Sequence, residues 1–145
     1  MIVIRSPQTK EDFKAYYALR YAVLREPWGH PRGTEKDDYE PISQHLMAVD
    51  EQSGEIVGVI KWLEREPGLA WVSHLAVSPG RQKQGIGKML VQAVEAAARA
   101  QGYQAIGAHS RLTSADYFEK LGYQIKDLPA HYFGTAQTVW LEKQL

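Results

Sequence analysis

The stretch LAVSPGRQKQGIGK, residues 75–88, decides the fold class of this 145-residue chain. It begins as the end of an apolar strand, passes through a polar turn, and runs into a helix from Gly85. That helix has one apolar face, whose residues recur at helical spacing: Ile86, Met89, Leu90, Ala93, Val94 and Ala97. A strand, a glycine turn and an amphipathic helix in this order are typical of α/β proteins.

The turn predicts a site for an anion. The first turn of a helix has backbone N–H groups without partners and a partial positive charge. Gly85 and Gly87 carry no side chain, so a ligand oxygen can approach those amides closely. Three basic residues surround the opening, namely Arg81, Lys83 and Lys88. A phosphate or pyrophosphate fits this pattern, while an ordinary helix start with a solvated basic face is the simpler alternative.

Two common nucleotide motifs do not fit the turn. It lacks the lysine–serine pair of an NTP-hydrolysing loop. It also lacks the third glycine and the downstream acidic residue of a dinucleotide fingerprint.

Periodic segments on both sides of this stretch predict a mixed sheet. Before it, we expect a strand at 2–5, a helix over 13–24 capped by Thr9, and strands at 45–50, 55–63 and 69–77. After it, we expect the helix to end before Gly102, then a strand at 104–109, a helix over 112–121, and strands at 123–125 and around 138–142. Residues 27–44 break every period and predict a long loop, which is a functional lid or a flexible segment. Antiparallel hairpins followed by a βαβ unit indicate one α/β domain over residues 1–145.

Composition excludes several classes of function. Seventeen basic residues balance seventeen acidic ones, which argues against a nucleic-acid binder that works through a broad basic face. The absence of cysteine excludes disulfides, thiolate catalysis and cysteine-based metal sites. Five scattered histidines without HExxH spacing predict no metal site. No apolar run could span a bilayer and no secretory signal opens the chain, so we expect a cytoplasmic protein.

Two motifs resemble the GNAT superfamily of acyl-CoA-dependent N-acetyltransferases. The first is Gln82-Lys83-Gln84-Gly85-Ile86-Gly87, which follows the strand end at Val77. The second is the aromatic–Glu–Lys–Leu–Gly–aromatic run Phe118-Glu119-Lys120-Leu121-Gly122-Tyr123. The order of the expected elements fits this superfamily along essentially the whole chain.

The resemblance implies a fold, a co-substrate and a role for the turn. The fold would be a mixed, mostly antiparallel sheet with helices on both faces and a V-shaped splay between two central strands. Acetyl-CoA would be the co-substrate, a primary amine of a small molecule or peptide the acceptor, and a homodimer a possible assembly. Main-chain amides would hold the pyrophosphate at Gln84, Gly85, Ile86, Gly87 and Lys88. The backbone of Leu75, Ala76 and Val77 would pair with the pantetheine arm, and Arg81, Gln82 and Lys83 would lie near the phosphates.

The catalytic groups are less clearly marked. Many members of the family place a proton-donating tyrosine at the position of Phe118, which has no proton to give. Tyr117 is one candidate donor, with a core or rim aromatic as the alternative, and a loop carrying His131 and Tyr132 could fold over the cleft. His74, on one wall of the expected cleft, is the first candidate for the general base, with a hydrogen-bonded sheet histidine as the alternative. His109 on the opposite strand is the second.

An acidic cluster predicts a cationic acceptor. Its members are Glu35, Asp37, Asp38 and Glu40, and Trp28, Tyr39 and Trp71 supply aromatic surface. The alternative is a solvated loop whose charges maintain solubility. Two other functions remain open, namely a non-catalytic acyl-CoA-binding module and acyl transfer to a hydroxyl.

Overall fold

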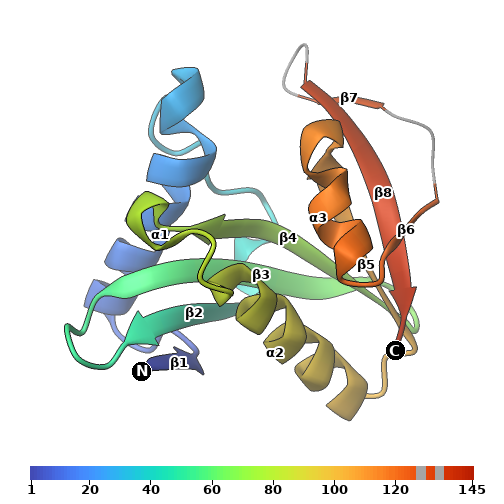
Figure 1. Ribbon diagram of the computed structural model, residues 1–145, viewed down its shortest axis with the longest axis horizontal. Helices are drawn as coiled ribbons and strands as arrows, with labels where there is room; N and C mark the ends of the chain where they lie inside the picture. The colour runs from blue at the N-terminus through green and yellow to red at the C-terminus, as the bar shows by residue number, and fades with distance from the viewer. Residues whose placement is uncertain (127–129, 133–135) are drawn as a thin grey trace. The chain divides into compact units, whose positions relative to one another are not determined.

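The computed structural model describes residues 1–126, 130–132 and 136–145 (Figure 1). The chain forms two compact units. The first contains Met1–Leu63 and His74–Val94, and the second contains Glu64–Ser73 and Glu95–Leu145. Three elements contribute residues to both units: β3 (Ile56–Glu66), β4 (Leu69–Val77) and α2 (Ile86–Ala100). The expectation of one domain over residues 1–145 stays a prediction.

The first unit is built on an antiparallel sheet. Besides its parts of β3, β4 and α2, it contains β1 (Ile2–Arg5), α1 (Lys10–Leu24), η1 (Glu26–Trp28), η2 (Glu40–Ile42), β2 (Gln44–Asp50) and η3 (Pro79–Arg81). β1 pairs with β2, and β2 pairs with β3, both in antiparallel register. The sequence predicts each of these strands to within a few residues.

The start of α1 confirms the predicted cap. The Thr9 hydroxyl accepts a hydrogen bond from the Asp12 amide at 3.0 Å, and the Asp12 carboxylate accepts from the Thr9 amide. This reciprocal pair satisfies two donors that the helix leaves free. The helix ends at Leu24, before Pro27 enters the 3-10 turn η1.

Consecutive residues of β3 face opposite helices. Val59 packs with Tyr16 of α1 and Met47 of β2 in a buried apolar cluster. Its neighbour Gly58 faces α2, and a Cβ placed there would lie 2.9 Å from side-chain atoms of both Ile86 and Leu90. Because strand side chains alternate between faces, α1 and α2 cover the two faces of this sheet. The predicted helices on both faces are therefore confirmed.

The second unit carries the parallel pairing. It contains β5 (Ala105–Arg111), η4 (Leu112–Ser114), α3 (Ala115–Lys120), β6 (Gln124–Ile125), β7 (Ala130–Tyr132) and β8 (Ala136–Gln144). β4 runs parallel to β5 from Leu69↔Ala105 to Val72↔Ala108, and β8 pairs antiparallel with β5, β6 and β7. The mixed, mostly antiparallel sheet is confirmed. In the described register β4 pairs with β5 only as far as Val72, although β4 itself continues to Val77. The expected splay requires the pairing of the two strands to end before the strand does.

Phe118 belongs to the core of the second unit. Its ring is 7% exposed and lies edge-on to Tyr123, with 5.5 Å between centroids. The Tyr123 hydroxyl donates to Glu95 at 2.8 Å, and the Lys143 ammonium donates to the Leu121 carbonyl at 2.9 Å. These contacts fix the end of α3 and account for the apolar residue at position 118.

The structure departs from the predicted elements in three places. The segment expected as a helix over 112–121 is divided into a 3-10 turn and the shorter α3. The loop over 27–44 includes two 3-10 turns, and β7 was not expected. The side chains of His131 and Tyr132 lie outside the described part of the chain.

Among the described residues, no helix is both long and apolar enough to cross a membrane.

Candidate functional site

The start of α2 presents free backbone donors. The helix begins at Ile86, and the first amide bonded to the preceding turn is that of Met89, which donates to the Gly85 carbonyl at 3.0 Å. None of the described residues accepts a hydrogen bond from the amides of Ile86, Gly87 or Lys88. These donors and the helix dipole favour an anion at this end of α2.

The backbone before α2 curves into a concave turn. Lys83 has φ 65° and Gly85 has φ 82°, both in the left-handed region. Such turns direct successive N–H groups toward one point and bind anions. A Cβ on Gly85 would meet nothing within 4 Å, so the space beside the turn is open. The turn is held in place because the Ser78 amide donates to the Val57 carbonyl at 2.8 Å.

The basic residues of the turn have different surroundings. The Arg81 guanidinium donates to the Asp50 carboxylate at 2.7 Å, and this hydrogen bond lowers the pKa of Asp50. Lys83 and Lys88 are exposed and form no ion pair with any described residue. Arg81 therefore ties the turn to β2, which favours the structural alternative for this residue. The two lysines remain candidates for contact with an anion.

The end of β4 leads into this turn. Ala76 is 2% exposed and packs in the core cluster, while Leu75 and Val77 are partly exposed. Gln82 returns toward the strand, and its side-chain amide donates to the Val77 carbonyl at 3.3 Å. Gln84 is exposed on the turn.

His74 occupies an irregular position in β4. Its φ of 54° lies in the left-handed region, which is unusual for a residue other than glycine within a strand. Burial and, to a smaller extent, the positive charges of Arg20 and Lys61 lower its pKa to about 3. The imidazole is therefore neutral at physiological pH and is a weaker base than an ordinary histidine.

Glu40 is the centre of a buried charge network in the first unit. One of its carboxylate oxygens accepts from Arg20 at 2.8 Å and from the Tyr17 hydroxyl at 3.0 Å. The other accepts from Lys61 at 2.8 Å and from the Asp37 amide at 3.1 Å. Both cationic side chains are fully buried. Burial opposes ionisation of Glu40, but these two cations outweigh it and hold its pKa far below the usual range.

The network corrects the expectation of an acidic acceptor site. Lys61 also pairs with the carboxylate of Asp37. Glu35 is 3% exposed, and its carboxylate accepts from the Gly33 amide at 2.7 Å. Of the four acidic residues only Asp38 is exposed and without such a contact among the described residues. Glu40 and Asp37 are thus engaged by buried cations and Glu35 by a backbone amide, so these three carboxylates hold the loop in place.

Tyr16 and His45 extend the same network. Arg20 donates to the Tyr16 hydroxyl at 2.8 Å, and that hydroxyl lies 2.8 Å from Nδ1 of His45. Nε2 of His45 donates to the Glu40 carbonyl at 3.0 Å. Burial lowers the pKa of His45, so the neutral ring accepts at Nδ1 and donates at Nε2.

Sequence reasoning missed the cations of the network, although both had a visible signal. Arg20 stands at a core-facing position of α1, and Lys61 interrupts the apolar run of β3. A charged residue at a core position usually has a buried partner.

The other candidate catalytic residues lie in the second unit. His109 is partly buried and lies edge-on to Trp140, with 4.9 Å between ring centroids, and to Trp71 at 6.1 Å. Tyr117 is 38% exposed, and burial of its hydroxyl raises its pKa, so it is protonated at neutral pH. Trp28 and Tyr39 are exposed on the loop of the first unit, whereas Trp71 contacts His109.

Comparison with known proteins adds three relatives. Residues 10–123 match the profile of the Acetyltransferase (GNAT) family. A protein of Bacillus subtilis strain 168 that is named as an acetyltransferase is 28% identical over 130 residues, which cover 83% of this chain and 82% of that protein. A crystal structure described as an N-acetyltransferase from Lactobacillus plantarum has a TM-score of 0.89 at 22% identity, covering 99% of this chain and 98% of that one. A GNAT acetyltransferase from Elizabethkingia anophelis with acetyl-CoA bound has a TM-score of 0.78 at 19% identity, covering 99% and 98%. The two structural likenesses concern the fold alone.

Replacing Glu40 tests the charge network. Glu40→Gln leaves two buried cations with one fewer anion, and we expect the free energy of unfolding at pH 7 to fall by about 3 kcal/mol. The pKa of Glu40 is lower in the folded chain than its ordinary value of 4.5, so its stabilisation is full above that pH and is lost on acidification. The difference between variant and parent should therefore shrink as the pH falls below 4.5.

Denaturant titrations at neutral and acidic pH measure both effects. Asp38→Asn on the same loop removes a carboxylate outside the network and should change stability by less than about 0.5 kcal/mol. Equal stability of the Glu40→Gln variant and the parent at pH 7 would contradict the assignment.

Proposed function

Because the chain belongs to the Acetyltransferase (GNAT) family, we propose that it transfers the acetyl group of acetyl-CoA to a primary amine of a small molecule or peptide. The amine attacks directly in a ternary complex. The observation that carries the proposal is the start of α2, where three backbone amides that donate to none of the described residues lie beside a concave glycine turn. A related protein of the same fold binds acetyl-CoA, which supports the same co-substrate here.

The turn fits the pyrophosphate of CoA. The free amides of Ile86, Gly87 and Lys88 would donate to the phosphate oxygens, and the exposed ammonium groups of Lys83 and Lys88 would neutralise their charge. Gly85 leaves the approach open, because a Cβ there would project into this space. The partly exposed backbone of Leu75 and Val77 would pair with the pantetheine arm as an added strand.

Acetyl-CoA supplies a thioester, whose carbonyl carbon the neutral amine attacks before the carbon–sulfur bond breaks. His74 would accept a hydrogen bond from the amine, since its ring stays neutral. Because its pKa is about 3, the imidazole would orient the amine through this hydrogen bond, and it would hold a proton taken from the amine only weakly. Tyr117 would donate a proton to the departing thiolate, because its hydroxyl is protonated and partly exposed. The attacking nitrogen would lose its proton to a base or to a water chain as the amide forms, and His109 is the second candidate for that base. Positioning of the two substrates can contribute up to about 7–11 kcal/mol.

A non-catalytic acyl-CoA-binding module is the second candidate function. The buried Phe118 favours it, because this ring fills the position of the usual proton donor and is held in the core by Tyr123. A binding module needs the turn before α2 but no proton donor. We also propose a cytoplasmic location and a homodimeric assembly for this chain.

A thiol-release assay with acetyl-CoA tests the transfer. We expect free CoA to appear only when an amine is added, with polyamines, amino acids, aminoglycosides and peptides as the panel. The acetylated product identified by mass spectrometry should carry one acetyl group on nitrogen. Tight acetyl-CoA binding with no release across the whole panel would favour the binding module instead.

A His74→Asn variant tests the role of His74. Asparagine tolerates the left-handed backbone at this position, so the strand should keep its course. We expect kcat to fall by at least about tenfold while the affinity for CoA stays unchanged. Because the pKa of His74 is about 3, the loss should be uniform between about pH 6 and pH 9. Equal kcat in variant and parent across this range would assign His74 a structural role.

A further inference from the structure

Basic side chains of the first unit fall into two classes. One class is paired with carboxylates, as in Arg5–Asp12, Arg20–Glu40, Lys61–Glu40 and Arg81–Asp50. Arg25 is buried and donates to the carbonyls of Thr34 and Leu24. The other class is exposed or lines a hollow and forms no ion pair with the described residues, and its members gather in two places. Lys83 and Lys88 are at the turn before α2, and four others line one hollow beside α1, namely Lys10, Lys14, Arg32 and Lys36.

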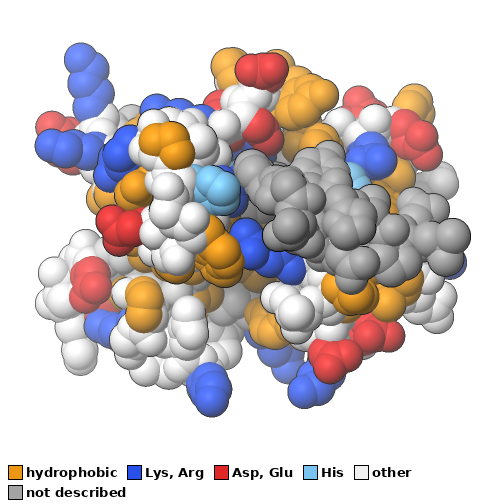
Figure 2. All heavy atoms as spheres, turned by 90° about the horizontal axis from the view of Figure 1, so that it is seen from above, with side chains coloured by type: hydrophobic (Ala, Val, Ile, Leu, Met, Phe, Trp, Pro, Cys, Tyr) orange, Lys and Arg blue, Asp and Glu red, His pale blue; other side chains and the backbone are white. Residues whose placement is uncertain are grey.

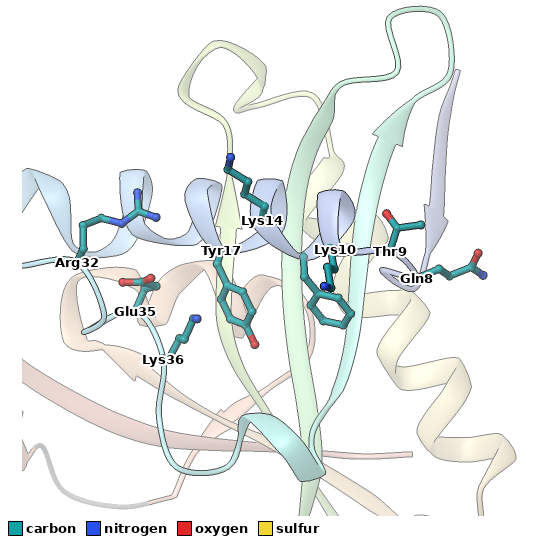
Figure 3. A pocket seen from close by; sticks show the side chains of 9 residues that line it. Gln8, Thr9, Lys10, Lys14, Tyr17, Arg32, Glu35 and Lys36 are labelled. Atoms are coloured by element: carbon teal, nitrogen blue, oxygen red, sulfur yellow. The ribbon is translucent and has the colours of Figure 1, made fainter.

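We call this depression the basic hollow. Its volume is about 510 Å³, and it is open to solvent. Phe13 and Tyr17, one helical turn apart, contribute two stacked and partly exposed rings, with 6.2 Å between centroids and 24° between planes. Figure 3 shows the lining side chains spread along α1, from Arg32 at one end to Gln8 at the other.

Aromatic rings hold two of the cations over the hollow. The Lys36 ammonium lies 4.4 Å from the centre of the Tyr17 ring, and the Arg32 guanidinium lies 4.8 Å from that of Tyr21. The one acidic residue of the lining, Glu35, is 3% exposed and already accepts from the Gly33 amide. The hollow therefore presents an excess of positive charge.

This charge is a local feature of the chain. The whole protein has equal numbers of basic and acidic residues, and the face seen in Figure 2 has both kinds interspersed. Four cations around one hollow create a field that attracts an anionic partner and orients it. The amides of Thr9 and Asp12 at the start of α1 take no part, because the reciprocal cap already engages them.

The spacing of the cations selects an extended ligand. Lys10 and Tyr21, over which Arg32 lies, are eleven residues apart on α1, which corresponds to about 16 Å along the helix axis. A single phosphate or carboxylate cannot reach both ends of this row. A peptide in an extended conformation covers the same length with about five residues.

We propose that the basic hollow docks an extended acidic peptide segment of a partner protein. Glutamate or aspartate side chains of the segment would pair with Lys10, Lys14, Arg32 and Lys36 along α1. The exposed edges of Phe13 and Tyr17 would cover its apolar atoms. This docking does not depend on acetyl transfer.

Fluorescence anisotropy with labelled hexaglutamate tests the proposal. The peptide should bind the full chain saturably at low salt, and binding should weaken as salt rises. Lys14→Glu/Lys36→Glu should weaken the affinity by at least about tenfold. The control Lys120→Glu/Lys126→Glu makes the same change in net charge at exposed positions of the second unit and should weaken it by less than about threefold.

Four outcomes would overturn the proposal. The first is an absence of saturable hexaglutamate binding to the parent protein, and the second is an equal loss of affinity in the two double variants. A hexathymidylate strand that binds more tightly than hexaglutamate would indicate a nucleic acid as the ligand. Loss of binding in Lys83→Glu/Lys88→Glu but not in Lys14→Glu/Lys36→Glu would place the peptide at the turn before α2.

Discussion

The close approach of α2 to β3 at Gly58 fixes the position of the anion site. A Cβ at this residue would lie 2.9 Å from side-chain atoms of Ile86 and of Leu90, so any larger residue would force these side chains to shift. Ile86 is the first residue of α2 and contributes one of its free amides. The same contact therefore sets the packing of the helix and the place at which its donors meet a ligand. Larger side chains at position 58 would move both together.

The loop after α1 is held by charge and not by apolar packing. Glu40 joins α1, through Arg20, to β3, through Lys61, and each partner is buried. A buried ion network is weak evidence for net stability, but breaking one member leaves an uncompensated charge. The network consequently ties the irregular loop to both α1 and β3. Burial is the main reason why His74 is neutral and weakly basic, and the cations of the network lower its pKa in the same direction.

Local patterns in the sequence predict most of the fold. The strand, turn and helix around Gly85, the cap at Thr9 and the parallel pairing of β4 with β5 follow from periodicity and motif order. Ion pairs between residues distant in sequence cannot be predicted in this way, because no local pattern shows which cation will pair with a given carboxylate. The sequence alone therefore points Glu40 to the acceptor and Arg81 to the phosphates, whereas in the structure they pair with Lys61 and Asp50. A Cβ at Gly85 would meet nothing within 4 Å, and the predicted approach of a ligand oxygen to this turn stays a prediction.

Calorimetric titration of CoA into two glycine variants tests the central claim most directly. Gly85 and Gly54 have φ of 82° and 75°, and a Cβ at either would meet nothing within 4 Å. Gly85→Val and Gly54→Val thus introduce the same backbone strain in two turns of the first unit, only one of which precedes α2. The account predicts that Gly85→Val weakens CoA binding by at least about tenfold and that Gly54→Val leaves it unchanged. Equal affinities in the two variants would contradict binding of the pyrophosphate by these amides.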